Sequence, residues 1–290
     1  MKTLRLVSSP FENLVRDLLR NAEREILVAS PFINLDGAKI FRDATPNRNR
    51  IELALLTNLS AQNIVAGVTQ PDAVLELCEG FKNASVSSLH RLHAKVFVID
   101  ERISLIGSAN LTGGGLRENY EYGAMIDDEE LALKVRADIL RYANLGNQIS
   151  QELLREIAQD GKRLAALKAA QEKETQKREA AKALRIAERK LNEKLLANRA
   201  KSGKTINEIF AETILHLLAE RGRLTTRELH RLVQETHPDI CDDKIDRVIN
   251  GLRFGKLWKH QVRNAQRFLK AQGKIQNVGE GRKTVWTLKA

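Results

Sequence analysis

Apolar residues in the first half of the chain follow two alternating patterns. Short apolar, β-branched runs alternate with longer stretches in which apolar residues recur at helical spacing. The runs predict strands at Leu4–Val7, Glu25–Ala29, Ile51–Leu56, Ala94–Ile99, Ile103–Ile106 and Tyr122–Ile126. The helical stretches are Phe11–Asn21, Pro71–Phe81 and Asp128–Tyr142. Strands that alternate with helices over residues 1–147 predict an α/β sandwich around a mixed sheet.

The pattern changes over residues 148–203. This segment contains no proline and is dominated by Ala, Glu, Lys, Arg and Leu, which are strong helix formers. An apolar seam from Ala180 to Leu191 is not continued on the N-terminal side, where Gly161 and the polar stretch Gln171–Arg178 interrupt it. We therefore predict a long helical linker and leave open whether it forms a coiled coil.

Residues 204–290 combine helices with a terminal hairpin. Helices are predicted at Ile206–Glu220, from a Thr225/Glu228 capping box to about Thr236, from Asp242 or Asp243 to about Asn250, and at Leu257–Gln272. Lys274–Val278 and Thr284–Leu288, joined by a glycine-containing turn, predict a β-hairpin. Helices followed by a basic hairpin predict a C-terminal winged helix.

Charge is unevenly distributed along the 290 residues. Residues 1–150 have 17 Lys/Arg and 19 Asp/Glu, whereas residues 205–290 have 16 and 10, which gives net charges of −2 and +6. A basic C-terminal part indicates a polyanionic partner, and nucleic acid fits that description. Cys78 and Cys241 lack the spacing of a metal site, so we expect reduced thiols in a cytoplasmic protein.

One segment carries an unusual set of polar residues. His93, Lys95 and Asp100 are followed by Gly107-Ser108-Ala109-Asn110, which gives the pattern H-x-K, four residues, D, six residues, G-S-x-N. His93 and Lys95 are two apart on a predicted strand, so their side chains should share one face. An imidazole beside a fixed ammonium is suited to nucleophilic attack on phosphate, and a hydroxyl and an amide suit its non-bridging oxygens.

This pattern resembles the HKD motif of the phospholipase-D superfamily, over about residues 1–147. The resemblance implies a phospholipase-D-like α/β sandwich and a phosphohistidine intermediate, without a metal ion or another cofactor. The catalytic residues that carry over are His93, Lys95, Ser108, Asn110, Glu121 and Asp100. Glu121 is expected to accept the second ring N–H of His93. The odd spacing of Asp100 from His93 indicates a supporting or structural role.

The mechanism implied by the resemblance needs two histidines, but this chain has one H-x-K. None of the other five histidines has a lysine two residues later, and His90 is expected at the surface. The resemblance therefore implies a homodimer in which two copies of His93 face each other. Gly113–Gly115 is interpreted as a loop, with a lid over the site as the alternative.

The C-terminal segment has a likeness of its own. Trp258–Leu288 resembles the amino-terminal winged-helix module of Mrr-type restriction proteins, through a helical apolar pattern followed by W-x-L. Trp258, Val262, Phe268, Leu269 and Trp286 are predicted core residues. The predicted DNA-binding residues are Lys259, Arg263, Gln266, Arg267, Lys270, Arg282 and Lys283. A winged helix that binds protein instead of DNA is the alternative.

Together these patterns predict a metal-independent DNA endonuclease that forms a homodimer through its catalytic domain. A role in restriction or antiviral defence is an analogy from the architecture. The alternatives are an RNase on structured RNA, a phospholipase-D-type lipid phosphodiesterase and a non-enzymatic DNA-binding protein. The low aromatic content of 4% and the short apolar runs argue against a membrane partner.

Overall fold

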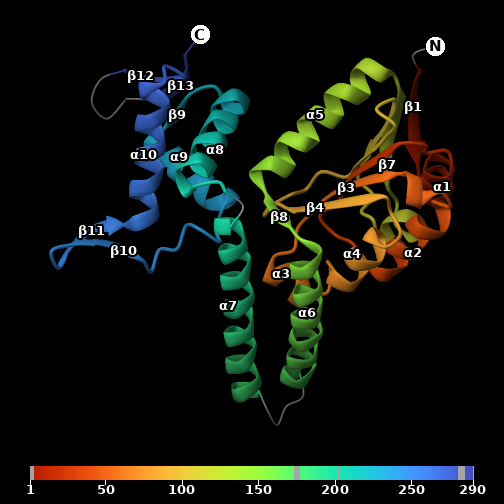
Figure 1. Cartoon of the computed structure of the whole chain (residues 1–290), viewed down its shortest axis with the longest axis horizontal. Helices are drawn as coiled ribbons and strands as arrows, with labels where there is room; N and C mark the ends of the chain where they lie inside the picture. The colour runs from red at the N-terminus through yellow and green to blue at the C-terminus, as the bar shows by residue number, and fades with distance from the viewer. Residues whose placement is uncertain (1–2, 173–176, 202, 280–284, 290) are drawn as a thin grey trace. The chain divides into compact units, whose positions relative to one another are not determined.

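The computed structural model describes residues 3–172, 177–201, 203–279 and 285–289. The chain divides into two compact units, Met1–Lys194 and Leu195–Ala290 (Figure 1). Each unit has its own sheet and its own buried apolar cluster. The predicted division into a catalytic domain over 1–147, a linker over 148–203 and a winged helix over 204–290 stays a prediction.

The first unit is built on an eight-stranded mixed sheet with the order β1-β7-β6-β5-β2-β3-β4-β8. The strands are β1 (Thr3–Ser8), β2 (Glu25–Ala29), β3 (Glu52–Thr57), β4 (Asn83–Ser88), β5 (Val96–Ile99), β6 (Ile103–Gly107), β7 (Tyr122–Asp127) and β8 (Asn147–Ile149). The β2–β3 and β3–β4 pairs are parallel, and the other pairs are antiparallel. The predicted α/β class with a mixed sheet is confirmed.

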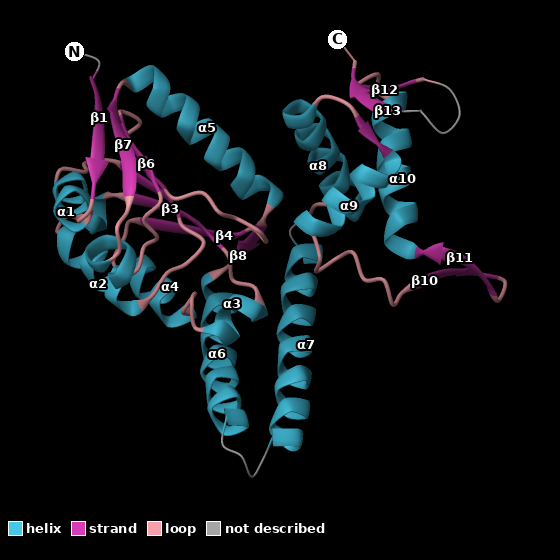
Figure 2. Cartoon of the chain, turned by 180° about the vertical axis from the view of Figure 1, so that it is seen from behind, coloured by secondary structure: helices cyan, strands magenta, loops and turns pink. Residues whose placement is uncertain are grey.

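Helices cover both faces of this sheet (Figure 2). They are α1 (Glu12–Arg20), α2 (Leu35–Ala44), α3 (Ala61–Ala66), α4 (Pro71–Cys78) and α5 (Glu129–Leu145), with short helical turns at Arg48–Arg50 and Gly114–Glu118. On one face, α5 packs Ala132 and Ile139 against Val96 and Val98 of β5. On the other, α2 packs between α1 and α4. The sequence patterns missed α2, α3, β4 and β8.

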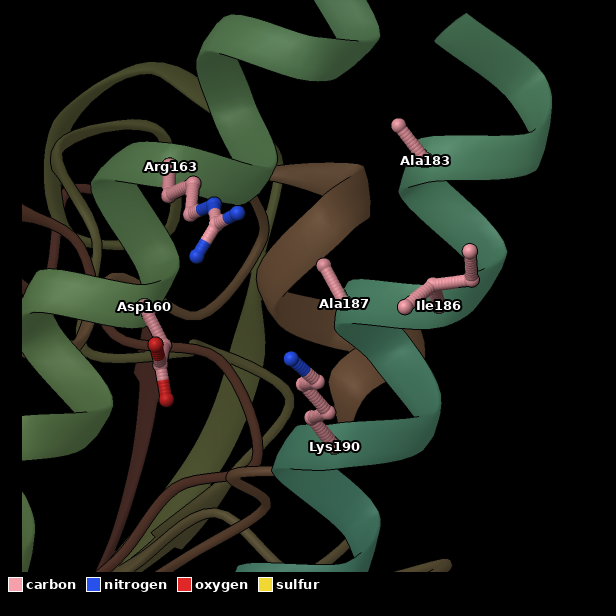
Figure 3. A pocket seen from close by; sticks show the side chains of 6 residues that line it. All are labelled: Asp160, Arg163, Ala183, Ile186, Ala187 and Lys190. Carbon is pink, nitrogen blue, oxygen red and sulfur yellow. The ribbon is translucent and has the colours of Figure 1, made fainter. Parts of the chain in front are cut away.

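The predicted single linker helix is wrong, because the segment forms two helices, α6 (Gln151–Glu172) and α7 (Lys177–Lys201). Their directions are opposed, since Lys194 Nζ of α7 lies 2.8 Å from Asp160 Oδ2 of α6. Figure 3 shows the small hollow between them, lined by Asp160, Arg163, Ala183, Ile186, Ala187 and Lys190. Folding back buries Leu191 of α7 completely, whereas a straight helix would leave it in water.

Helix α6 is also part of the first unit's packing, which the linker prediction did not anticipate. It contacts α3 and α4 and buries Leu154 and Ile157 completely. Gly161 makes this approach close, since a β-carbon there would lie 3.3 Å from both Ile64 and Pro71. Gly161, which interrupts the apolar seam in the sequence, therefore lets α6 lie close against α3 and α4.

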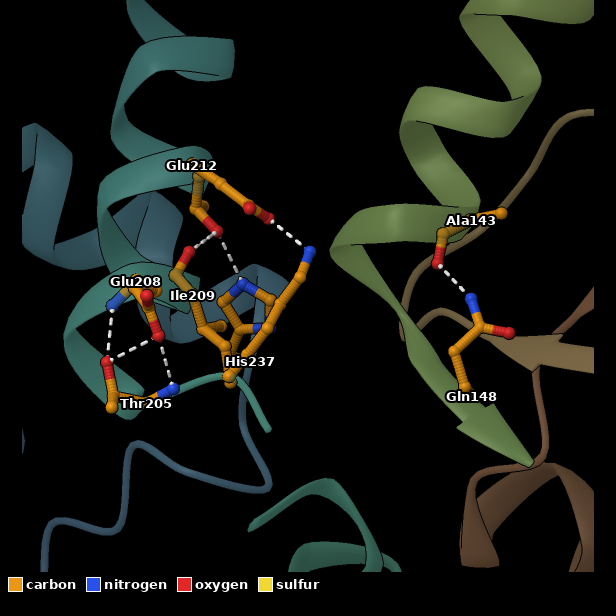
Figure 4. Close-up of polar contacts among 9 residues, drawn as sticks. Ala143, Gln148, Thr205, Glu208, Ile209, Glu212 and His237 are labelled. Atoms are coloured by element: carbon orange, nitrogen blue, oxygen red, sulfur yellow. Dashed lines mark hydrogen bonds and ion pairs between the residues drawn. The ribbon is translucent and has the colours of Figure 1, made fainter. Parts of the chain in front are cut away.

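The second unit contains α8 (Ile206–Arg221), α9 (Thr226–Thr236) and α10 (Leu257–Ala271). A small sheet with the order β12-β13-β9 joins Ile275–Val278, Val285–Leu288 and Leu224–Thr225. Capping boxes open α8 at Thr205 with Glu208, drawn in Figure 4, and α9 at Thr225 with Glu228. The second capping box had been predicted from the sequence and is confirmed. That the unit is a winged helix stays a prediction.

The predicted third helix from Asp242 or Asp243 to Asn250 is wrong. The structure has a hairpin there, β10 (Asp246–Ile249) and β11 (Leu252–Lys256). The turn residues Asn250 and Gly251 have φ of 50° and 78°. Two successive left-handed residues form the two-residue turn that matches strand twist, and Asn-Gly is its preferred sequence. This turn signal outweighs the helical spacing.

The core of the second unit lies between α8, α9 and α10. Trp258, Val262 and Leu269 are buried as predicted, and Trp286 packs against the cluster half-buried. Phe268 was predicted in the core, but it is 42% exposed, because the helical period places it at the edge of the buried stripe formed by Val262, Ala265 and Leu269. His237 is fully buried beneath α8, where its Nε2 lies 2.7 Å from Thr213 Oγ1 (Figure 4).

Candidate active site

The candidate catalytic residues gather at one end of the large sheet. His93 and Lys95 precede β5, Ser108 follows β6, and Glu121 precedes β7. The antiparallel β5–β6 and β6–β7 pairs bring these strand ends together. The predicted strand Ala94–Ile99 begins two residues later, at Val96, so His93 and Lys95 lie in the segment that leads into the sheet. The Lys95 carbonyl still accepts from Gly107 N at 3.1 Å.

Lys95 is a buried cation beside His93. It is 8% exposed, and its Nζ donates to the main-chain carbonyl of His93 at 2.9 Å. Burial lowers the pKa of Lys95, and the nearby negative charge of Glu121 opposes that shift. A desolvated ammonium in this position interacts strongly with a phosphate, because little water screens the charge.

Glu121 is the centre of a polar network. Its carboxylate accepts a hydrogen bond from the Ser108 hydroxyl and another from Asn119 Nδ2 at 3.1 Å. Ser108 Oγ in turn accepts from Tyr122 N at 3.1 Å. The His93 side chain is exposed, and no hydrogen bond joins its ring to Glu121 within the described residues. The predicted His93–Glu121 contact is therefore absent from this arrangement.

Ser9 is a site residue that the sequence did not indicate. Its hydroxyl donates to Asn119 O at 2.7 Å and accepts from Glu121 N at 2.5 Å. These bonds tie the end of β1 to the segment that carries Glu121. Ser9 lies more than 100 positions from either partner, and no motif links them, so the pairing of β1 with β7 is the signal that finds it.

Asn110 has an amide oxygen that no hydrogen bond satisfies. Its Oδ1 is buried without a partner, and its main-chain carbonyl accepts from Thr112 N at 2.8 Å. Gly115 packs on this residue so closely that a β-carbon there would lie 2.5 Å from the Asn110 carbonyl oxygen. The glycine run, which was predicted as a loop, instead begins the helical turn Gly114–Glu118 and packs against Asn110. A buried amide oxygen without a partner is suited to accepting a hydrogen bond from a donor.

Asp100 lies far from the other candidates. β5 separates it from His93, and seven residues of extended chain span roughly 20 Å. Its carboxylate accepts from the main-chain nitrogens of Glu23, Arg24 and Glu25 at 2.9, 2.7 and 2.9 Å. Asp100 thus fixes the chain where it enters β2. This geometry agrees with a structural role and gives it no contact with the candidate site.

The predicted DNA-binding residues fall into three groups. Arg263, Arg267 and Lys270 lie exposed on α10, and Lys259 Nζ lies 5.2 Å from the centre of the Trp258 ring. Gln266 was predicted on the exposed face, but it is 1% exposed, because it continues the buried spacing from Val262 to Leu269. Arg282 and Lys283 lie outside the described residues.

Comparison with known proteins identifies the class of the first unit. Residues 15–142 match the family model described as "Cardiolipin synthase, PLD-like domain". An uncharacterized protein of Helicobacter pylori (strain J99 / ATCC 700824) is 28% identical over 152 residues, 47% of this chain and 30% of that protein. Cardiolipin synthase A of Pseudomonas fluorescens (strain SBW25) is 39% identical over 79 residues, 26% of this chain and 16% of that protein. Among solved structures, NucT from Helicobacter pylori aligns with a TM-score of 0.41 and 20% identity, over 50% of this chain and 98% of that one.

Residues 15–142 are therefore similar to a phospholipase-D-like domain. This match agrees with the phospholipase-D-like part of the resemblance, and the prediction of an enzyme is confirmed. The chain spans less than a third of the length of these two curated relatives. In the described part of the chain, every helix is too short or too polar to span a bilayer.

Proposed function

We propose that this protein is a metal-independent endonuclease that hydrolyses DNA through a covalent phosphohistidine. The observation that carries the proposal is the placement of a desolvated cation, Lys95, against an exposed histidine, His93, at the end of the sheet where Ser108 and Asn110 also lie. This set provides a nucleophile together with a fixed cation, and with a hydroxyl and an amide near the phosphate oxygens.

In the proposed first step, a ring nitrogen of His93 attacks phosphorus and the bond from phosphorus to the leaving oxygen breaks. The leaving oxygen takes a proton from the same histidine of a second chain. In the next step that second histidine removes a proton from water, the water oxygen bonds to phosphorus, and the N–P bond breaks. Lys95, with Ser108 and Asn110, stabilises the charge on the non-bridging oxygens in both steps.

A second chain requires a surface that can hold it close to His93. One face of β1, β7 and β6 offers exposed apolar side chains: Leu4 is 69% exposed, Leu6 64%, Tyr122 60% and Ile106 37%. The register places Leu6 and Ile106 on either side of Ala124, so these side chains share one face. This face reaches the strand ends that carry Ser108 and Glu121. We propose it as the interface of a two-fold homodimer.

The second unit supports DNA as the substrate in this proposal. Its residues 205–290 have a net charge of +6, and α10 presents Arg263, Arg267 and Lys270 to solvent. The order of three helices and a small antiparallel sheet is that expected of a winged helix, with α10 as the helix that enters the major groove. A function in restriction or antiviral defence, in the cytoplasm, completes the proposal by analogy.

A second candidate function is a lipid phosphodiesterase, favoured by the match to a cardiolipin synthase family model. The two substrates share a phosphodiester, so the catalytic residues do not distinguish them. The test is to incubate the full-length protein with plasmid DNA, structured RNA and anionic phospholipid vesicles, each with and without excess EDTA. The proposal expects DNA cleavage that EDTA does not abolish. Release of a lipid headgroup without DNA cleavage, or cleavage of RNA alone, would overturn it.

The dimer has a test of its own. Leu6→Lys places a charge in the proposed interface and should convert the protein to monomers by light scattering, with loss of cleavage. Val68→Lys, at a position 36% exposed on the connection between α3 and α4, is the matched control and should leave mass and activity unchanged. A wild-type protein that cuts DNA as a monomer would refute the shared site.

A further inference from the structure

The hairpin β10–β11 has no core of its own. Figure 1 shows it extending away from α8 and α9, at the N-terminal end of α10. Four apolar side chains near its tip are exposed: Leu252 by 66%, Val248 by 57%, Phe254 by 47% and Ile249 by 39%. Ile249 pairs with Leu252, and Val248 pairs with Arg253, so apolar groups lie on both faces. An isolated two-stranded ribbon is marginally stable in water, and such a patch marks an interaction site.

The base of the hairpin is nevertheless fixed to α10. Leu257 N donates to Ile245 O at 3.0 Å, where the hairpin passes into the helix. His260 of α10 contacts both strands, with Nε2 2.5 Å from Phe254 O and Nδ1 3.1 Å from Arg247 Nη1. Lys256 Nζ donates to Asp246 Oδ1 across the pair at 2.8 Å. The hairpin is therefore held in a defined direction relative to the exposed face of α10.

The charge of the hairpin identifies its partner. Residues 244–256 include Lys244, Arg247, Arg253 and Lys256 against one carboxylate, Asp246. That carboxylate already lies near Lys256 and, at 3.7 Å, near Arg253. A second copy of the hairpin would bring like charges together, which disfavours pairing between chains. An anionic partner with an apolar interior would bind the cations of the hairpin and also bury the apolar side chains at its tip.

We propose that the hairpin inserts its apolar tip into a groove of duplex DNA and bends the duplex. This rests on the proposed function, in which α10 binds the major groove. Arg263, Arg267 and Lys270 continue the basic surface from the hairpin along α10, which favours an extended polyanion over a flat bilayer. In a groove of duplex DNA, phosphates line the walls and the stacked bases form the floor. Ile249 and Leu252, which pair on one face of the tip, enter between base steps, while Arg253 on the other face lies toward the phosphates.

The test uses full-length protein carrying His93→Ala, so that the duplex stays intact. A duplex of about 30 base pairs carries 2-aminopurine to report unstacking and a dye pair at its ends to report bending. The hairpin variant is Ile249→Ser with Leu252→Ser, and Val68→Ser removes an exposed apolar side chain elsewhere as the control. A charge variant, Arg263→Gln with Arg267→Gln, tests α10 separately.

We expect the hairpin variant to lose the 2-aminopurine signal and the bend, to bind about tenfold more weakly, and to keep its salt dependence. The control should behave as the His93→Ala parent. The α10 variant should reduce the slope of log affinity against log salt concentration by about 2. Unchanged unstacking in a folded hairpin variant would overturn the insertion while leaving the proposed function intact. Failure of the parent to bind duplex at all would overturn both.

Two further outcomes count against the insertion. A shift of the hairpin variant to lower mass by light scattering would make the tip a contact between chains. Hairpin-dependent binding to anionic vesicles, without binding to DNA, would make it a membrane contact. Circular dichroism confirms that each variant is folded before these results are compared.

Discussion

Replacing Asp100 with alanine tests whether this motif residue supports the fold or the chemistry. The carboxylate accepts three main-chain hydrogen bonds, from Glu23, Arg24 and Glu25 at 2.7–2.9 Å. Each charge-assisted bond contributes about 1 kcal/mol when partly exposed, so Asp100→Ala should lower the free energy of unfolding by about 3 kcal/mol. The φ of 52° adds a smaller loss, because aspartate tolerates the left-handed region better than alanine.

The assay pairs urea unfolding, followed by circular dichroism, with DNA cleavage at a temperature where both proteins are folded. Asp100→Asn is the matched control, since it keeps one acceptor oxygen and tolerates the same backbone, and it should lose about half as much stability. Cleavage by folded Asp100→Ala should stay within about threefold of wild type. A thousandfold loss of activity with unchanged stability would refute the structural role and return Asp100 to the catalytic set.

Three further predictions follow from individual side chains. Burial, with Arg263 and Lys259 adding to it, lowers the pKa of His230 to about 4. As the pH falls, the unfolded chain therefore binds a proton at His230 before the folded chain does. Between pH 8 and 5 the free energy of unfolding of wild type should fall by about 2 kcal/mol relative to His230→Gln, measured by tryptophan fluorescence. Equal pH profiles for the two proteins would contradict this. Lys95→Met should keep the fold but slow DNA cleavage by on the order of 10²–10³-fold, and near-normal single-turnover rates would oppose its role. Gly161→Leu should lower the free energy of unfolding by about 2 kcal/mol, because the side chain meets α3 and α4, and a variant as stable as wild type would contradict that packing.

The sequence predicted those parts of the fold whose signals are local. The six predicted strands pair in the large sheet, because each is a compact apolar run. Strand β4 and the edge strand β8 were missed, since Asn83–Ser88 is mostly polar and Asn147–Ile149 is only three residues long. Their pairing depends on neighbours far away in the chain, which periodicity does not report.

In the candidate site, too, residues close together in the sequence were predicted and residues brought in from far along the chain were not. His93, Lys95, Ser108 and Asn110 were found from one motif spanning 18 residues. Ser9 was missed because it reaches the site only through the β1–β7 pair. Gln266 was misplaced because a polar residue on a regular helical stripe reads as exposed, although the spacing from Val262 puts it inside. A single sequence does not show which residues that are far apart along the chain become neighbours in the fold.

The fold-back of α6 and α7 is a case of competing principles. Helix propensity is high throughout this segment and predicts one long helix. The side chain of Leu191 on α7 is completely buried in the folded-back arrangement. Burial of such a side chain stabilises by about 2 kcal/mol, which exceeds the propensity gained by continuing through a few more helical residues.

The most direct test of the central claim is the single-turnover rate of plasmid cleavage in excess EDTA, compared between wild type and His93→Ala. If His93 forms the covalent bond to phosphorus, the variant should be slower by on the order of 10⁴-fold, about 5 kcal/mol of barrier, while remaining folded and bound to DNA. Cleavage by His93→Ala at a rate near wild type, or wild-type cleavage that EDTA abolishes and Mg²⁺ restores, would contradict the account.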